Sequence, residues 1–318
     1  MKKVLFATTA LVATAGVAAA DVTFGGLGRF GVLYNEGNPT DEWSLTSRFR
    51  LIVTGTAESD NGLSFGAQIR YQADGHEQSQ GVPGTTGGTA GLPNSNAAST
   101  AGFNTPRFWV TAGGFTVSVG QTLGAIENMP NMYTGSIGLT GLGFANVVYN
   151  FGADAYSSGS GGTQGLDVIW SGGAWGVHFT HSWSSDGNLT LSSDRTAMMV
   201  SYAFGNWTIA GGYQDSDIAG DTEWAITSGA TFGAWDVAFN IADNDGFLKY
   251  GVGANWQAGA STFVRGYINH DEAADMGSGD ENMGIGFQHR LGGGTFVEGG
   301  VADLAGTTRA DLGLRFSF

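Results

Sequence analysis

Apolar and polar residues alternate along most of this chain, and the C-terminal segment shows the pattern most clearly. From Arg309 to Phe318, every second side chain is apolar, and the positions between them carry arginine, aspartate, glycine and serine. A period of two places these two sets on opposite faces of a β-strand. One face of that strand is therefore apolar throughout, and the other carries charges.

The same alternation recurs along the chain and predicts an all-β fold. Sixteen segments show it, and an even number of strands is typical of single-chain bacterial membrane barrels. The pattern predicts strands at 22–35, 42–57, 61–73, 105–113, 115–122, 165–171, 174–184, 194–204, 206–216, 222–232, 234–244, 247–257, 260–271, 281–291, 294–304 and 308–318.

The connections between these segments alternate in length. Tight turns are predicted at 172–173, at Gly205, at Gly233 and at 258–259. Longer links rich in Asp, Asn, Gly and Ser lie between them, at 185–193, 216–221, 271–280 and 305–307. Short turns at one rim and longer loops at the other are typical of outer-membrane barrels, whereas a soluble sandwich would not alternate so regularly.

Aromatic side chains gather near the ends of the predicted strands. Phe204 and Trp207 flank one tight turn, and Tyr34, Trp43 and Tyr213 lie near the opposite strand ends. Two aromatic girdles at the two water interfaces of a membrane would have this arrangement. Ordinary aromatic residues at strand ends are the alternative. The sequence therefore predicts a 16-stranded antiparallel transmembrane β-barrel.

The first twenty residues have the composition of a secretory signal peptide. Two lysines precede a run of apolar or small residues, and three alanines close it before Asp21. We expect cleavage there, which leaves residues 21–318 as the barrel and exports the chain through the periplasm. A membrane anchor is the alternative, but the run is short for a spanning helix. No later stretch has about 18 apolar residues.

Charge and cysteine content exclude several classes of function. Residues 21–318 lose Lys2 and Lys3, so the 13 basic residues become 11 against 28 acids, a formal charge of 11 − 28 = −17. Nucleic-acid partners need a basic surface. The absence of cysteine excludes thiolate chemistry. The acidic balance predicts a weak preference for cations at the mouth of a channel.

Arginines are the most informative charged side chains of the predicted barrel. The strand register places seven of them on the face opposite the apolar one, and closure brings their five strands together. These residues are Arg29, Arg48, Arg50, Arg70, Arg107, Arg309 and Arg315. Charges facing lipid would be destabilising by about 2–4 kcal/mol near the midplane. We therefore expect one basic wall inside a water-filled lumen.

A long segment after the fifth strand offers the opposite charge. Segment 123–164 carries Glu127 and Asp154, and loops of this length without regular structure are usually functional or disordered. If it folds into the lumen, these acids face the basic wall and set a transverse field across the constriction. The alternative is an external loop, with the arginines paired to Asp311 and Glu298.

Short motifs of enzymes and metal sites occur without the context that they need. Residues 26–31 match a dinucleotide glycine pattern and residues 62–66 a nucleophile-elbow pattern, but both lie in strand segments with no helix following. No enzyme activity and no cofactor is therefore predicted. Asp243 and Asp245 have calcium-like oxygen chemistry, which suggests a possible Ca²⁺ site on an external loop that bridges to lipopolysaccharide.

Several of these features together resemble the Gram-negative general porins, most closely the alphaproteobacterial type. They are the leader, the opening residues 21–26, the sixteen strands, the long loop after strand five and the alternating Leu312, Leu314, Phe316 and Phe318. The resemblance implies a homotrimer with one pore per subunit and a constriction formed by the third external loop. It also implies that Leu314, Phe316 and Phe318 are read by the barrel-assembly machinery.

The resemblance and the residues together predict passive diffusion of small hydrophilic solutes and ions across the outer membrane. A substrate-specific channel for sugars or anions is the alternative. An outer-membrane lipase or protease is disfavoured because no catalytic group is visible.

Overall fold

The structure, a computed structural model, describes residues 20–39, 41–75, 100–122, 124–149, 164–183, 194–216, 223–273 and 280–318. Almost all regular structure in these ranges is β-strand, with one short 3₁₀ helix. The elements are β1 (Asp21–Asn35), β2 (Trp43–Glu58), β3 (Ser64–Gly75), β4 (Thr100–Phe103), β5 (Arg107–Ala112), β6 (Phe115–Gly120), η1 (Leu142–Phe144), β7 (Gln164–Gly172), β8 (Trp175–Trp183), β9 (Arg195–Phe204), β10 (Trp207–Ser216), β11 (Glu223–Phe232), β12 (Trp235–Asn244), β13 (Phe247–Gln257), β14 (Thr262–Asp271), β15 (Glu281–Gly292), β16 (Thr295–Leu304) and β17 (Thr307–Ser317).

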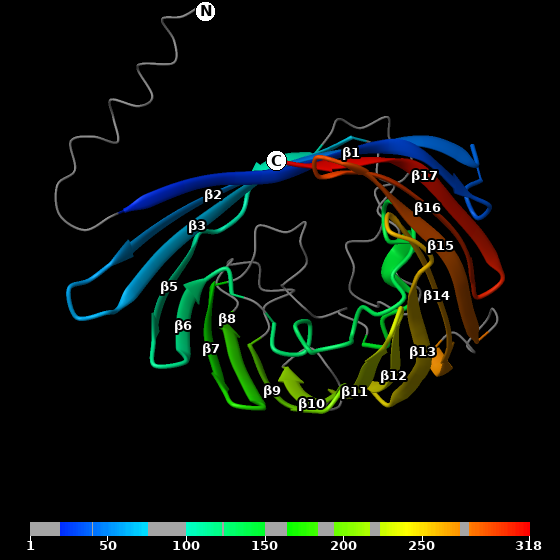
Figure 1. Cartoon of the computed structure of the whole chain (residues 1–318). Coiled ribbons are helices and arrows are strands. Elements are labelled where there is room, and N and C mark those ends of the chain that lie inside the picture. The colour runs from blue at the N-terminus through cyan, green and yellow to red at the C-terminus, as the bar shows by residue number, and fades with distance from the viewer. Residues whose placement is uncertain are drawn as a thin grey trace, which may run out of the picture.

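Neighbouring strands pair antiparallel around a closed barrel. β1 pairs with β2 on one side and with β17 on the other, so the sheet has no free edge at the chain ends. Figure 1 looks along the barrel, with blue β1 beside red β17. β4 and β5 both pair with β3 and form one interrupted barrel strand. The predicted 16-stranded antiparallel barrel is confirmed.

The break between β4 and β5 was not predicted, because the sequence pattern began this strand at residue 105. Pro106 lies in the break, and proline has no N–H to donate to the ladder. Asn104 bridges the break, since its side-chain Oδ1 accepts from the Arg70 amide at 2.6 Å and its own amide donates to the Arg70 carbonyl at 2.9 Å. The strand therefore extends back to Thr100, into a segment expected to be loop.

The two faces of the barrel follow the alternation of the sequence. Large apolar side chains such as Phe24, Leu45 and Phe239 are exposed on the outside. Polar side chains such as Asp167 and Asp311 are buried on the inside. Since the outer surface is a belt of aromatic and aliphatic side chains, it is suited to contact with the hydrocarbon interior of a membrane. No helix among the described residues is long and apolar enough to cross a bilayer.

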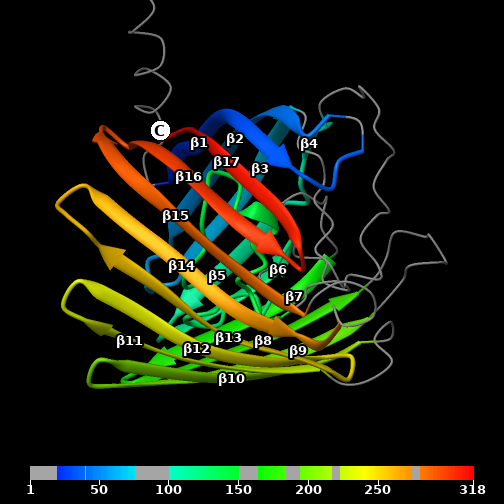
Figure 2. The same ribbon diagram turned by 90° about the vertical axis from the view of Figure 1, so that its right-hand side faces the viewer.

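Tight turns join neighbouring strands at one rim of the barrel, and the opposite ends of the strands lie at the other rim, called here the long-loop rim (Figure 2). Two connections at the long-loop rim are nevertheless two-residue turns, 245–246 and 305–306. Asp245 and Ala305 adopt positive φ of 57° and 52°, as such hairpin turns require. The expectation of a longer link at 305–307 is therefore wrong. The backbone amide of Gly246 donates to the Asp243 carboxylate at 2.8 Å and stabilises the first of these turns.

Aromatic side chains lie at both rims, and neighbours across the strands contact one another. At the tight-turn rim, the rings of Trp235 and Trp256 stack with centroids 5.4 Å apart, and Trp207 contacts Phe232 at 5.7 Å. At the long-loop rim, the ring centroids of Tyr34 and Trp43 lie 5.0 Å apart. The rings are therefore placed where two interfacial girdles would need them.

The C-terminal residues close the barrel over two outward-facing glycines. The amide of Gly26 donates to the Phe318 carbonyl at 2.9 Å, and the Phe318 amide donates to the Gly26 carbonyl at 3.2 Å. The ring of Phe318 covers Gly26, and the ring of Phe316 covers Gly28, so closely that a Cβ at either glycine would clash. Leu314 pairs opposite Phe30 in the same seam.

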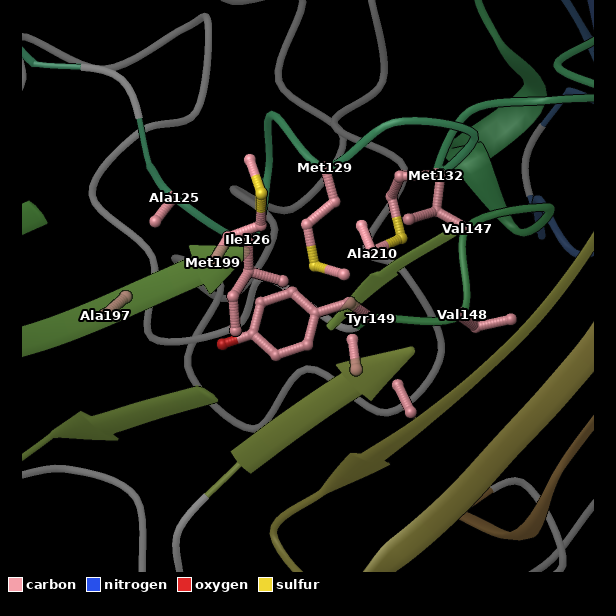
Figure 3. Packing of buried hydrophobic residues seen from close by; sticks show 12 residues of the cluster. Ala125, Ile126, Met129, Met132, Val147, Val148, Tyr149, Ala197, Met199 and Ala210 are labelled. Atoms are coloured by element: carbon pink, nitrogen blue, oxygen red, sulfur yellow. The ribbon is translucent and has the colours of Figure 1, made fainter. Parts of the chain in front are cut away.

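Residues 124–149 fold into the barrel and lie along its inner wall, where Figure 1 shows them as a green trace inside the ring of strands. Their apolar side chains pack against small residues of β9 to β12 in a cluster that includes Ile126, Met129, Met132, Tyr149 and Ala210 (Figure 3). The predicted inward fold of this loop is confirmed for the described part of segment 123–164. The inner face under the loop carries small apolar residues such as Ala210 and Ala225, beside polar side chains that bind the loop.

Candidate functional site

Hydrogen bonds fix the inward loop to the barrel wall along its length. The Thr227 hydroxyl donates to the Pro130 carbonyl at 2.6 Å, and the Asn269 side chain donates to the Ala145 carbonyl at 2.5 Å. At its end, the Tyr149 hydroxyl donates to the buried Glu223 carboxylate at 2.5 Å. Because strands far apart in the sheet each supply a hydrogen-bond partner, the loop is held in a fixed position inside the lumen.

The strongest attachment of the loop is to Asp311 on β17. One carboxylate oxygen accepts from the Leu139 amide at 2.9 Å, and the other accepts from the amide and the hydroxyl of Thr140, both at 2.7 Å. The Leu139 carbonyl in turn accepts from Arg29 Nη1 at 3.0 Å. Asp311 thus anchors the loop, whereas the external-loop alternative would have paired it with the arginines.

Glycines allow the loop backbone to approach the wall closely. Gly135 has φ +86°, and a Cβ there would lie 2.6 Å from the Gly266 carbonyl oxygen of β14. Gly138 has φ +77° and lies directly against the Asp311 carboxylate. Side chains at these positions would be strained and would push the loop into the lumen.

The structure places the predicted basic residues on the inner wall, where they form one central group and three separate positions rather than a single cluster. The central group lies on β1, β2 and β3. The register puts Arg29 directly opposite Arg48 on one side and opposite Arg315 on the other. Asp74 lies opposite Arg48 and binds its Nε at 2.5 Å. Like charges side by side are destabilising unless compensated, and Asp74 and the Leu139 carbonyl supply that compensation.

Arg50 and Arg70 complete the central group, one step closer to the tight-turn rim. Arg50 Nε donates to the Gln72 side chain at 2.8 Å. Arg70 is attracted electrostatically by Glu127 of the loop and by Asp74. The loop and the arginine wall therefore act on each other across the water of the lumen.

The remaining three arginines lie at three other places on the wall. Arg107 pairs with Ser118 at 2.9 Å and with the buried Asp167 at 3.4 Å, to the side of the central group. Arg315 is held by Glu298 at 2.7 Å and stacks on the Phe296 ring at 4.6 Å, toward the tight-turn rim. Arg309 lies two residues from the start of β17 at the long-loop rim, beside Tyr267.

The acidic side of the constriction differs from the sequence-based expectation. Glu127 lies on the loop, part-buried, and attracts Arg70 electrostatically. Asp154 lies outside the described residues. Asp74 was not singled out from the sequence, although it lies at the inner-face position of β3 two residues after Gln72. The predicted strand ended at residue 73, so Asp74 fell one position beyond it, whereas the observed strand continues to Gly75.

The lumen-facing side of the loop carries two aromatic rings. Tyr133 and Phe144 contact each other edge to face, with ring centroids 6.3 Å apart. Both are exposed, and Phe144 lies over Gly141, next to the segment that Arg29 and Asp311 hold. This pair was not predicted from the sequence, because the alternation of apolar and polar residues gives no information about side chains in an irregular loop.

The possible calcium site at Asp243 and Asp245 stays a prediction. Asp243 caps the turn that contains Asp245. Within the described ranges, no group of three or more His, Asp or Glu side chains is arranged to hold a metal ion.

A closed barrel with an apolar exterior, charged interior and an inward loop defines a transmembrane channel. Residues 7–309 match the family model for Gram-negative porins. The chain is 29% identical to a porin of Fuscovulum blasticum and 28% identical to a porin of Rhodobacter capsulatus, in each case over 94% of this chain and the whole relative. An engineered variant of Rh. blastica porin superposes with TM-score 0.74 at 23% identity, covering 94% of this chain and all of that one.

The chain belongs to the Gram-negative porin family. The match of the family and the membrane-spanning barrel place the protein in the outer membrane, as a channel protein. The predicted resemblance to alphaproteobacterial porins is confirmed by the two relatives.

Proposed function

We propose that this porin lets small hydrophilic solutes and ions diffuse passively through a water-filled lumen narrowed by residues 124–149. The observation that carries the proposal is the fixed loop inside a closed barrel, opposite a wall of arginines. The loop sets the size of solutes that pass, and the charges on both sides orient dipolar solutes in a transverse field. Apolar solutes would have to displace the water that the charged groups bind.

Two measurements test this function directly. Purified protein in a planar bilayer should give stepwise, ohmic conductance in KCl. Liposomes that contain it should swell in isosmotic sugars, faster for small sugars than for large ones. Saturable uptake of one sugar, with others excluded at equal size, would instead favour the alternative of a substrate-specific channel. Bilayers that stay electrically silent would refute the channel itself.

We further propose that residues 1–20 direct export and are removed before Asp21. The apolar run and the three alanines before that position support this proposal. Mass spectrometry of the protein from outer membranes should show an N-terminus at Asp21. A mature chain that retains Met1 would contradict it.

We also propose that the protein functions as a homotrimer and that the barrel-assembly machinery reads the Phe318 seam. Family resemblance supports both. Unheated electrophoresis should show a trimer that dissociates on boiling, with conductance steps in multiples of three. Deletion of Phe318 removes two backbone hydrogen bonds and the ring over Gly26, so it should lower the yield of folded barrel. Unchanged yield would argue against the assembly role.

Contacts of the external rim with lipopolysaccharide, bridged by Ca²⁺ at Asp243 and Asp245, are a final proposal. The acidic side chains of these two residues support the proposal, because Ca²⁺ prefers oxygen ligands. Calorimetry should show heat when Ca²⁺ is added to the detergent-solubilised protein, and less heat for Asp245→Asn. The absence of heat would remove the proposal.

A further inference from the structure

The inward loop separates its apolar side chains into two unequal sets. Nearly all of them are buried against the wall, among them Ile126, Met132 and Leu142 at 0–1% exposure. Tyr133 and Phe144 are the exceptions, at 37% and 47% exposure. Because the loop lies inside the barrel with its other side on the wall, the exposed surface of these rings faces the water of the lumen.

The backbone holds Phe144 in this position against its own preference. Phe144 has φ +54°, a left-handed conformation that is unfavourable for a side chain with a Cβ. Gly141, Leu142 and Gly143 before it also have positive φ, so the whole turn is left-handed. A non-glycine residue kept in such a conformation is a reason to look for a function of its side chain.

The arginine wall offers hydrogen-bond donors across the lumen from these rings. Among the described residues, Gln72 is the only side chain that accepts from the Arg50 guanidinium, at Nε, and Arg70 Nε has no partner. No described residue accepts a hydrogen bond from the outer nitrogens of either guanidinium group, and both side chains are only part-buried. A guanidinium binds a carboxylate with two parallel hydrogen bonds, which makes it a strong and oriented anion site.

Two contacts show that the loop and the wall face each other at this level. Glu127, before the aromatic pair in the chain, acts electrostatically on Arg70. Leu139, between Tyr133 and Phe144 in the chain, accepts a hydrogen bond from Arg29. Tyr133 follows Glu127 by six residues and Phe144 follows Leu139 by five, so both rings lie close in the chain to the points where the loop interacts with the arginines.

We propose that the constriction is a binding site for small aromatic carboxylates. The carboxylate is held by Arg50 and Arg70, and the ring lies against the edge-to-face pair of Tyr133 and Phe144. This inference rests on the proposed channel function and deepens it, because it gives the pore a preferred class of solute. It also opposes the cation preference expected from net charge.

The energetics favour weak binding with fast release. Contact with an aromatic pair adds to binding beyond the effect of the area buried. A transport site must bind weakly enough for the solute to leave on the other side. A carboxylate without a ring can engage only the arginines, and a neutral ring can engage only Tyr133 and Phe144.

The experiment measures how solutes interrupt the KCl current through single channels of the full-length mature protein. Benzoate is the probe, with acetate as the ringless anion and benzyl alcohol as the neutral ring. We expect benzoate to reduce the current in a saturable way, and acetate and benzyl alcohol to do so at concentrations about tenfold higher or not at all, as expected when one of two contacts is missing.

Substitutions assign the two halves of the site. Phe144→Gly removes the ring and suits the left-handed backbone, so it avoids the strain that alanine would keep. It should raise the half-blocking concentration of benzoate by about fivefold, in line with the loss of one aromatic contact. Arg50→Gln with Arg70→Gln should weaken the block by benzoate and by acetate alike. Phe239→Leu, on the outer face of β12, should leave block and conductance unchanged.

The outcomes separate this inference from the channel function. KCl steps without benzoate block, or equal block by acetate and benzoate, would overturn the aromatic site and leave the channel intact. Block that survives Phe144→Gly unchanged would overturn the role of the ring. Bilayers without any KCl steps would overturn both proposals.

Discussion

Replacing Asp311 should release the inward loop and widen the pore. Its carboxylate accepts three hydrogen bonds from Leu139 and Thr140, and it is only 6% exposed, so water has little access to the donors it would abandon. Asp311→Asn keeps the shape but puts an amide NH₂ opposite backbone N–H groups. Asp311→Ala removes the acceptors altogether. In both variants the loop loses its attachment beside Arg29.

The size of the effect follows from the bonds that are lost. Hydrogen bonds to a charged acceptor contribute about 1.5–3 kcal/mol each, and three on one carboxylate are not additive. We take a net loss of about 3 kcal/mol, which shifts the balance between attached and detached loop about a hundredfold at 1.4 kcal/mol per factor of ten. The barrel strands keep their pairing, so the change should appear in the channel more than in the fold.

Single-channel recording and liposome swelling measure this release. Both variants should show larger or noisier conductance steps and admit sugars that the parent excludes, with Asp311→Ala the stronger. Asp303→Asn is the matched control, because that carboxylate lies on β16 and accepts from the Gly306 amide in a turn. Unaltered conductance, noise and size cut-off in both Asp311 variants would show that the loop does not depend on this anchor.

Three further predictions concern other parts of the lumen and its rim. Arg48→Ala with Arg50→Ala should shift the permeability ratio toward cations by about threefold, from the loss of two positive charges in a water-filled lumen, as measured by reversal potential. Gly135→Ala should destabilise the loop by about 1–3 kcal/mol through backbone strain and make the current noisier, because its Cβ would meet the Gly266 carbonyl. Glu36 accepts from the Thr308 amide at 2.9 Å, which lowers the pKa of that exposed carboxyl below 4.5. This contact is present above pH 4.5 and is lost as the pH falls through the lowered pKa, which amide exchange of Thr308 should report.

Controls make these predictions decisive. Gly205→Ala also places alanine at positive φ but has open space around its Cβ, so it isolates strain from collision. If it makes the current as noisy as Gly135→Ala does, close approach to the wall is not the cause. A reversal potential unmoved by the arginine substitutions would remove those residues from the selectivity region. Thr308 exchange that is identical in Glu36→Gln at neutral pH would show that the contact has no effect.

The sequence alone determined the barrel, because alternation is a local property. The apolar face of each strand, the even strand number and the tight turns at one rim can all be read from neighbouring residues. The inner-face position of Arg29, Arg48 and Arg50 followed from the same parity. The length and the acids of the segment after the fifth strand made it a candidate for an inward loop, with an external loop as the alternative.

Only the tertiary structure decided which side chains meet inside the lumen. The positions of Asp74, Asp311 and Phe144 depend on which strands meet around the circle and on where an irregular loop touches them. Such contacts join residues more than a hundred positions apart, as Leu139 and Asp311 are. Periodicity carries no information at that separation, whereas the closed sheet fixes the register of every strand and with it the partner of each charge.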